Sequence, residues 1–180
     1  DVSLRLSKKI PNPKNRFLAD PFIIKKKQAH YCFVEDYNYN TKKGSISAYK
    51  ITTNGFANIG IVLQEDFHLS YPFLFEYENE IYMCPETCQK KEIRIYKCIE
   101  FPNKWVFHKT LINNILAVDT NIFELNGRWW LFTNIDLSTA GDRNSQLHIF
   151  YSDNPLSQNW IAHNSNPVIF DPLVARNGGM

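Results

Sequence analysis

The chain has 180 residues, of which 44% are apolar and 21% are charged, so it can build a folded core and a disordered chain is excluded. Aromatic residues make up 14%, and 9 prolines accompany them, which favours β-structure and excludes a collagen-like chain or a coiled coil. The net charge of +2 is too balanced for a nucleic-acid-binding surface. We therefore expect no nucleic-acid partner, and we expect the lysine clusters 25–27 and 42–43 to be solvated.

The segment shows neither a membrane span nor a signal peptide. No run of eighteen apolar residues exists, so no membrane span is expected in this segment. The N-terminal stretch lacks the apolar core of a signal peptide, which slightly favours the cytoplasm but leaves the compartment unknown. The chain starts with Asp1 rather than Met and ends at Met180 without closing signals, so we expect an incomplete domain.

The cysteines give no sign of a metal site. Cys32, Cys84, Cys88 and Cys98 form no CxxC pair and have no zinc-like spacing to a histidine. We expect buried free thiols rather than a metal site or a disulfide, and we expect no cofactor.

Three segments share one hairpin pattern. Each begins with a leading residue, continues with an apolar strand and a polar turn, and has an aromatic residue eleven positions after the leading residue. The segments are 20–35, 71–86 and 119–134, with Asp20, Tyr71 and Asp119 as leading residues. The turn Asn126–Gly127 is the clearest hairpin signal, because both residues tolerate a positive φ. Three hairpins of one design indicate an internal repeat.

Each hairpin is followed by two further predicted strands. The third strands are 46–49, 93–96 and 147–150, and the fourth strands are 60–63, 105–111 and, less regularly, 160–169. The leading residues lie 51 and then 48 positions apart, a period typical of four-stranded propeller blades. A jelly roll or a lipocalin-like barrel is the alternative, but neither requires similar residues after every four strands.

The predicted fold is therefore an all-β propeller, present as about three four-stranded blades and the start of a fourth. We expect residues 1–180 to form a single, incomplete domain with repeats at about 20–70, 71–118 and 119–170. The fourth repeat begins near residue 174, where Val174–Arg176 match Ala117–Asp119. Propellers usually close with four to eight blades, so the closing blades are expected outside this chain.

The amino-acid sequence of the repeats resembles that of a known family. The phrases that carry the resemblance, from residue 19 onward, are ADPF, HLSYPFLFEYENEIYMCPET, FPNKWVFHKTLINNILAVDTNIFELNGRWWLFTNID, LHIFYSDNPL and NPVIFDPLVARNGG. They resemble the N-terminal domain of plant glucosamine inositolphosphorylceramide transferases. Similar domains accompany sugar formyltransferases in bacteria. That family is similar to the five-bladed propellers of glycoside hydrolase families 43, 32 and 68. The resemblance implies a five-bladed type and a carbohydrate-related role, although a fold alone does not set an activity.

The leading residues are the first candidate site. In a propeller, equivalent strand starts converge on one end of the axial channel, so Asp20, Tyr71, Asp119 and Arg176 should meet there. Two carboxylates, a phenol and a guanidinium suit the hydroxyl groups of a sugar. In the hydrolases that the chain resembles, a first-blade Asp is base or nucleophile, a third-blade Asp orients it, and a fourth-blade Glu is the acid. Asp20 and Asp119 match the first two as candidate catalytic residues, but Arg176 stands where the fourth unit begins and no acid matches.

Three further residues are candidate substrate contacts. Glu35 and Glu86 both lie fifteen positions after their leading residues, where Asn134 stands in the third repeat. Their alternative role is to bind backbone N–H groups at the edge of a loop. His68 lies just before Tyr71 and near the predicted funnel, with a surface or core histidine as the more ordinary alternative.

Other features are expected to serve the fold. One of Trp129 and Trp130 should face the blade interface and the other the opposite side, with a sugar-stacking platform as the alternative. Trp105 and Trp160 should be structural. The longest loop, 135–145, could overhang the funnel.

Three functions remain open. The first is a glycan-binding propeller that serves as an accessory to a transferase domain and takes a saccharide or glycoconjugate. The second is a glycoside hydrolase that uses Asp20 and Asp119, and the third is a propeller that binds other proteins. The resemblance and the predicted carboxylate pair favour a sugar ligand over a protein partner.

Overall fold

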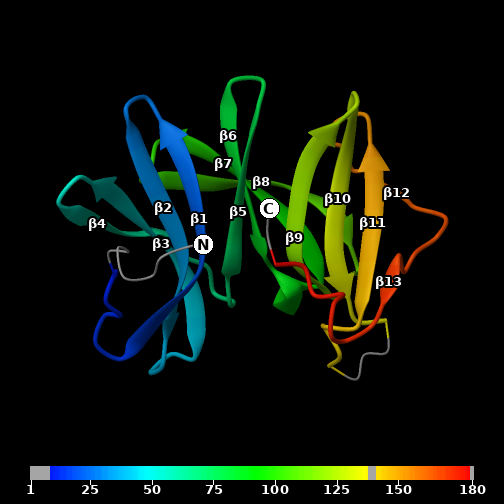
Figure 1. Ribbon diagram of the computed structural model, residues 1–180, viewed down its shortest axis with the longest axis horizontal. Helices are drawn as coiled ribbons and strands as arrows, with labels where there is room; N and C mark the ends of the chain where they lie inside the picture. The colour runs from blue at the N-terminus through cyan, green and yellow to red at the C-terminus, as the bar shows by residue number, and fades with distance from the viewer. Residues whose placement is uncertain (1–8, 138–140, 179–180) are drawn as a thin grey trace.

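The computed structural model describes residues 9–137 and 141–178, which form three antiparallel sheets side by side in chain order (Figure 1). The N-terminal residues 1–8, part of the predicted loop 135–145 and the chain end 179–180 lie outside the described residues. The first sheet has the order β1-β2-β3-β4, with strands β1 (Arg16–Lys26), β2 (Ala29–Asn38), β3 (Lys43–Thr52) and β4 (Gly55–Leu63).

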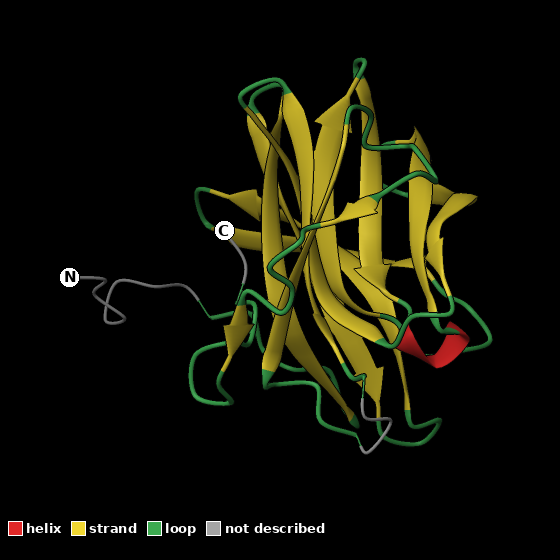
Figure 2. Ribbon diagram, turned by 90° about the vertical axis from the view of Figure 1, so that its right-hand side faces the viewer, coloured by secondary structure: helices red, strands yellow, loops and turns green. Residues whose placement is uncertain are grey.

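The other two sheets repeat this meander. The second has strands β5 (Ser70–Tyr77), β6 (Glu80–Glu86), β7 (Glu92–Glu100) and β8 (Lys104–Asn113), with a short 3-10 helix, η2 (Cys88–Lys90), before β7. The third has β9 (Ala117–Leu125), β10 (Arg128–Ile135), β11 (Gln146–Ser152) and two short pieces, β12 (Ile161–Ala162) and β13 (Ile169–Phe170), which both pair with β11. Strands and loops account for nearly the whole described chain, which confirms the all-β prediction (Figure 2).

The sheets do not close into a ring within the described residues. Strand β1 packs against β5, and β5 packs against β9, so the first strands of the three sheets are neighbours. The predicted irregularity of the last strand is confirmed, because β12 and β13 replace one continuous strand.

The first hairpin of each sheet turns over two residues, and the third of these turns is the predicted Asn126–Gly127 turn. The turns are Lys27–Gln28, Glu78–Asn79 and Asn126–Gly127. Glu78, Asn79, Asn126 and Gly127 all have positive φ values, between 50° and 74°. Turns with two positive φ values match the right-handed twist of the strands that they join.

Each leading residue lies at a β-bulge, which the sequence patterns did not reveal. The ladder is interrupted between Ala19 and Phe22, between Ser70 and Phe73, and opposite Phe132–Asn134. The φ angles of Asp20, Tyr71 and Asp119 are 47°, 46° and 52°, in the left-handed region that non-glycine residues seldom enter. Bulges of this kind redirect side chains and are frequent beside functional sites.

Two apolar cores hold the sheets together. The core between the first and second sheets includes Phe33, Ile46, Met83, Tyr96 and Trp105, and the core between the second and third includes Phe73, Cys84, Ile95, Leu111, Ile122 and Leu131. Trp129 packs against Phe75 and Tyr77 in the second core, while Trp130 contacts Tyr151 on the other face of its sheet. The predicted division of this tryptophan pair is therefore observed.

The four cysteines are free and buried, as expected. Burial raises the pKa of the Cys32 thiol to about 11, which keeps it in the unreactive protonated form. Within residues 9–137 and 141–178, no helix is both long and apolar enough to cross a membrane.

Candidate functional site

A cluster of four carboxyl groups forms where the bulges lie. We call Asp20, Glu35, Glu86 and Asp119 the carboxyl cluster. The sheet register produces it, because Ala19 pairs with Glu35 and Ser70 pairs with Glu86, each next to a leading residue. Because β1, β5 and β9 are neighbours, these positions from three sheets come together.

Glu35 is a buried carboxyl group that contacts another carboxyl group of the cluster. It is 7% exposed and lies within hydrogen-bonding distance of Asp20. Burial is the main cause that raises its pKa to about 7, and the negative charges of Asp20 and Glu86 add to the effect. The predicted alternative, a carboxylate that binds nearby backbone N–H groups, is not what the structure shows for this residue.

Glu86 and Asp119 form the other half of the cluster, together with Arg176. Burial, followed by the charge of Asp119, raises the pKa of Glu86 to about 7, against the opposing effects of Arg176 and Arg143. Asp119 is 7% exposed, and burial raises its pKa although the Arg176 side chain donates a hydrogen bond to it from Nε. The ion pair between Asp119 and Arg176 joins the third sheet to the last residues of the chain.

The C-terminal segment is held beside the cluster by the third repeat. Asn134, which is fully buried, donates from Nδ2 to the carbonyl oxygen of Ala175 at 2.9 Å and accepts from the amide of Asn177 at 2.7 Å. Arg176 Nη1 donates to the Arg143 carbonyl oxygen at 3.1 Å and to Asn144 Oδ1 at 3.0 Å. The described end of loop 135–145 therefore does reach the cluster, and Figure 1 shows the C-terminal segment running inward from β13.

His68 adjoins the first half of the cluster. Its Nε2 lies 3.6 Å from Glu35 Oε1, and its Nδ1 accepts a hydrogen bond from the Gly44 amide at 2.8 Å. Burial, and then the charge of Arg143, lowers the pKa of His68.

Tyr71 differs from the other leading residues because it is buried between sheets. It is 4% exposed, packs edge-on against Phe22 and donates a hydrogen bond to Asn121 Oδ1 at 3.2 Å. Burial raises the pKa of its phenol to about 12. Its hydroxyl group thus already has a partner within the protein.

Among the residues that the structure describes, no group of three or more His, Cys, Asp or Glu side chains is arranged to hold a metal ion. The acidic side chains approach one another in pairs, and guanidinium groups supply the positive charge.

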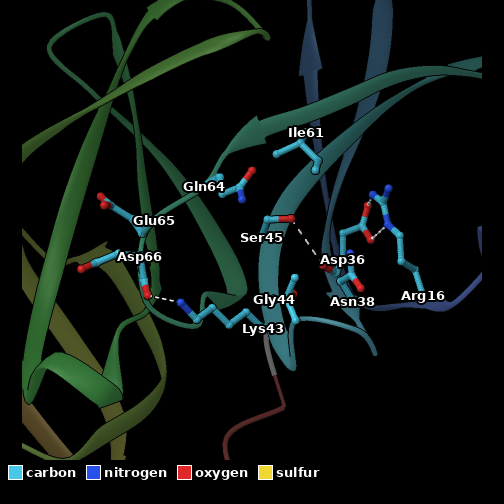
Figure 3. Close-up of a pocket in the computed structure, with 11 residues that line it drawn as sticks. Arg16, Asp36, Asn38, Lys43, Gly44, Ser45, Ile61, Gln64, Glu65 and Asp66 are labelled. Atoms are coloured by element: carbon cyan, nitrogen blue, oxygen red, sulfur yellow. Dashed lines mark hydrogen bonds and ion pairs between the residues drawn. The ribbon is translucent and has the colours of Figure 1, made fainter.

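A polar cavity lies apart from the carboxyl cluster, beside the start of β3, where the sequence predicted no site (Figure 3). This cavity of about 330 Å³ is lined by Arg16, Asp36, Lys43 and Gly44 among others, and by no residue of the carboxyl cluster. The buried Asp36 carboxylate accepts from Arg16 Nε at 2.6 Å and from Ser47 Oγ at 2.5 Å. These groups satisfy one another, so we regard the cavity as part of the structural frame of the first sheet.

Solved structures with similar folds are propeller glycoside hydrolases. A family 117 glycoside hydrolase from Zobellia galactanivorans superposes with a TM-score of 0.72 at 11% identity, covering 91% of this chain and 61% of that one. An α-L-arabinanase from Cellvibrio cellulosa superposes with a TM-score of 0.63 at 13% identity, covering 90% of this chain and 58% of that one. At these identities the likeness establishes a propeller-like fold alone.

Closer relatives are known from sequence. Glucosamine inositolphosphorylceramide transferase 1 from Oryza sativa subsp. japonica is 41% identical over 172 residues, and the protein of that name from Arabidopsis thaliana is 37% identical over 171. The matches cover 93% of this chain but only 23% and 22% of those proteins, so the chain spans about a quarter of their length. A family model described as "Glucosamine inositolphosphorylceramide transferase 1, N-terminal" matches residues 5–180, and the chain belongs to that family.

Proposed function

We propose that this chain is a carbohydrate-binding propeller domain that holds a saccharide or glycoconjugate at the carboxyl cluster. The observation that carries the proposal is the convergence of four carboxyl groups from three sheets with Arg176 of the C-terminal segment. Carboxylates accept hydrogen bonds from sugar hydroxyls, protonated carboxyls and guanidinium groups donate them, and such mixed clusters suit a ligand with many hydroxyl groups.

The proposal includes a larger ring and a partner domain. We infer that the three sheets are blades of a five-bladed propeller, since β1, β5 and β9 adjoin as the inner strands of a ring do. The family and the short share of the relatives' length support a role beside a transferase domain. The name of the relatives makes headgroups that contain glucosamine or inositol phosphate the first ligands to test.

Arg176 favours binding over hydrolysis. Hydrolysis by a pair of carboxyl groups needs one acid and one base on opposite sides of the glycosidic bond. Asp119, one of the two candidate catalytic residues, is held in an ion pair with Arg176. The role that the resemblance implies for Asp119 is to orient the base, so hydrolysis needs its acid elsewhere, and Arg176 stands at the start of the fourth repeat where no acid matches. An aspartate held by Arg176 can still accept hydrogen bonds from sugar hydroxyl groups.

The test is calorimetric titration of the protein with a panel of mono- and oligosaccharides, including the glucosamine- and inositol-containing headgroups. We expect Asp20→Ala and Asp119→Ala to weaken the binding of the selected sugar about 10- to 100-fold, the effect of losing a charged hydrogen bond. Glu124→Ala is the matched control, because this exposed residue lies on β9 away from the cluster and should leave affinity unchanged. Unchanged affinity in both Asp variants would refute the location of the site.

Glycoside hydrolysis is the second candidate function, and one observation favours it. Glu35 and Glu86 have pKa values raised to about 7, so either could hold a proton at neutral pH and serve as the acid that the fourth repeat lacks. Release of the leaving group from aryl glycosides by the wild type, and its loss in Asp20→Asn, would establish hydrolysis. A protein that binds sugar without such release is a binding domain.

A further inference from the structure

Four residues form a connected chain of contacts from the first sheet into the carboxyl cluster. The Gly44 amide donates to His68 Nδ1 at 2.8 Å, His68 Nε2 lies 3.6 Å from Glu35 Oε1, and Glu35 is within hydrogen-bonding distance of Asp20. The His68 ring also packs edge-on against Tyr37, with ring centroids 5.9 Å apart. The imidazole is therefore held on three sides.

Gly44 allows this close approach because it has no side chain. A Cβ atom at this position would overlap the carbonyl oxygen of Leu69 and would lie 2.9 Å from His68 Cε1 and 3.1 Å from Glu35 Oε1. The Gly44 carbonyl also accepts a hydrogen bond from the Leu69 amide at 3.1 Å. The start of β3 and the segment 68–69 are thus fastened together at the point where His68 meets Glu35.

The Gly44 amide also determines the protonation state of His68. An amide N–H can only donate, so His68 Nδ1 must act as an acceptor and cannot carry a proton. The neutral ring then carries its proton on Nε2, the nitrogen that faces Glu35. A doubly protonated ring would place two donors against each other at Gly44, so His68 cannot supply a positive charge to the cluster without breaking this contact.

Among the residues that the structure describes, the charged groups that act most on Glu35 are negative. The charged groups that act on it are Asp20 on β1, Glu86 on β6 and Asp119 on β9, with neutral His68 on its other side. The two guanidinium groups nearby, Arg143 and Arg176, act on Glu86 instead. Glu35 is buried and Asp20 is half-buried. Two carboxyl groups in contact at such a site cannot both ionise at low cost, and one of them keeps a proton.

We propose that Asp20 and Glu35 form an acid pair that holds one proton between them at neutral pH. His68 acts as a positioning residue: it stays neutral, so it contacts Glu35 without placing a positive charge beside the pair. The carboxylic acid of Glu35 donates to the Asp20 carboxylate. The pair thus offers a ligand both a donor and an acceptor, as a sugar hydroxyl requires. This inference deepens the proposed saccharide site, and its consequence for binding rests on that proposal. The test of the shared proton needs no sugar, so the acid pair and the saccharide site can fail separately.

The test is a pH titration of the protein with ¹³C-labelled glutamate side chains, followed by NMR and assigned with Glu35→Gln. In the wild type we expect the Glu35 carboxyl to titrate near pH 7. In Asp20→Asn its midpoint should fall by about 1 pH unit or more, because both a negative charge and a hydrogen-bond acceptor are lost. Asparagine tolerates the left-handed backbone at position 20, so this variant is expected to keep the bulge.

Glu86→Gln is the matched control, because it removes a nearby negative charge without removing the contact between Glu35 and Asp20. Its effect on the Glu35 midpoint should be clearly smaller than that of Asp20→Asn. Equal effects, or a wild-type Glu35 that titrates near 4.5, would overturn the shared proton. ¹⁵N NMR of the wild-type histidines should show His68 neutral and protonated on Nε2 from pH 6 to pH 8, and an Nδ1-protonated or charged ring would overturn its assigned role.

Discussion

Gly44→Ala is the substitution that tests the geometry of the site most directly. Gly44 has an ordinary backbone φ, so alanine could adopt its conformation and the cost would come from the added methyl group alone. That methyl would overlap the backbone oxygen of Leu69, a residue that is fully buried. A backbone oxygen cannot rotate away as a flexible side chain can, so the segment 68–69 must move.

The magnitude follows from three contributions. Overpacking of this kind costs about 1–3 kcal/mol. Displacement of the segment weakens two hydrogen bonds of Gly44, to His68 and to Leu69, each worth about 1 kcal/mol. Alanine lowers the conformational entropy of the unfolded chain, which offsets about 0.4–1 kcal/mol of the lost stability. We expect the free energy of unfolding to fall by about 3 kcal/mol, which in a chain of this size lowers the melting temperature by roughly 6–12 °C.

Urea unfolding, extrapolated linearly to water, measures this change. Gly178→Ala is the matched control, because Gly178 also has no positive φ and a Cβ there would meet nothing within 4 Å. The control should stay within about 0.5 kcal/mol of the wild type. A Gly44→Ala protein that is as stable as the control would refute the close packing of β3 against segment 68–69, and with it the geometry assigned to His68.

Two further predictions concern the cluster and the C-terminal segment beside it. Burial raises the pKa of Glu35 and Glu86 to about 7 from an ordinary value of 4.5, so between these values the folded chain binds more protons than the unfolded chain and stability falls as pH rises. Glu35→Gln should therefore lessen the loss of stability between pH 5 and pH 8 by about 1–3 kcal/mol in urea titrations, and an unchanged loss would contradict the shift. Asn134→Ala leaves the Ala175 carbonyl and the Asn177 amide without their partner, so it should cost about 2–4 kcal/mol and speed proteolysis near residue 176, whereas protection equal to the wild type would show that the segment is held by other means.

The fold was largely predictable because it is a repeat. Three hairpins with the same spacing, and turns such as Asn126–Gly127, are local signals that do not depend on distant contacts. The positions of the third and fourth strands follow from the same period. The break of the last strand into β12 and β13 was indicated only as an irregularity, since no local pattern states where pairing with β11 stops.

The site was predictable in part. The leading residues Asp20 and Asp119 were expected to converge with Arg176, and the structure brings Asp119 and Arg176 into an ion pair. Glu35 was expected either to contact the substrate or to bind backbone N–H groups at a loop edge, and its contact with Asp20 was not predicted. Counting back from the two-residue turn at 27–28 places Glu35 opposite Asp20, so hairpin arithmetic could have found the contact without the structure.

The bulges and the function of Gly44 could not be read from the sequence. A bulge at Asp20, Tyr71 or Asp119 has no residue signature, because none of the three is a glycine, and their left-handed φ values are imposed by the surrounding sheet. Gly44 is required because β3 and segment 68–69 approach closely. The Gly44–His68 hydrogen bond joins residues that are 24 positions apart in the chain. Contacts of that range depend on how the sheets pack, which periodicity does not report.

The balance of charge in the cluster connects the binding proposal with the acid pair. Four carboxylates and the two guanidinium groups of Arg143 and Arg176 would leave an excess of negative charge at a largely buried site, which is costly. Protons held by Glu35 and Glu86 remove that excess without a metal or a further cation. The same protons turn two acceptors into donors, so the solution to the charge problem also produces the mixed hydrogen-bonding surface that a neutral, hydroxyl-rich ligand needs. A negatively charged group gains least from such a surface, so within the glucosamine- and inositol-containing headgroups we expect the cluster to contact the hydroxyl-bearing sugar portion rather than the phosphate.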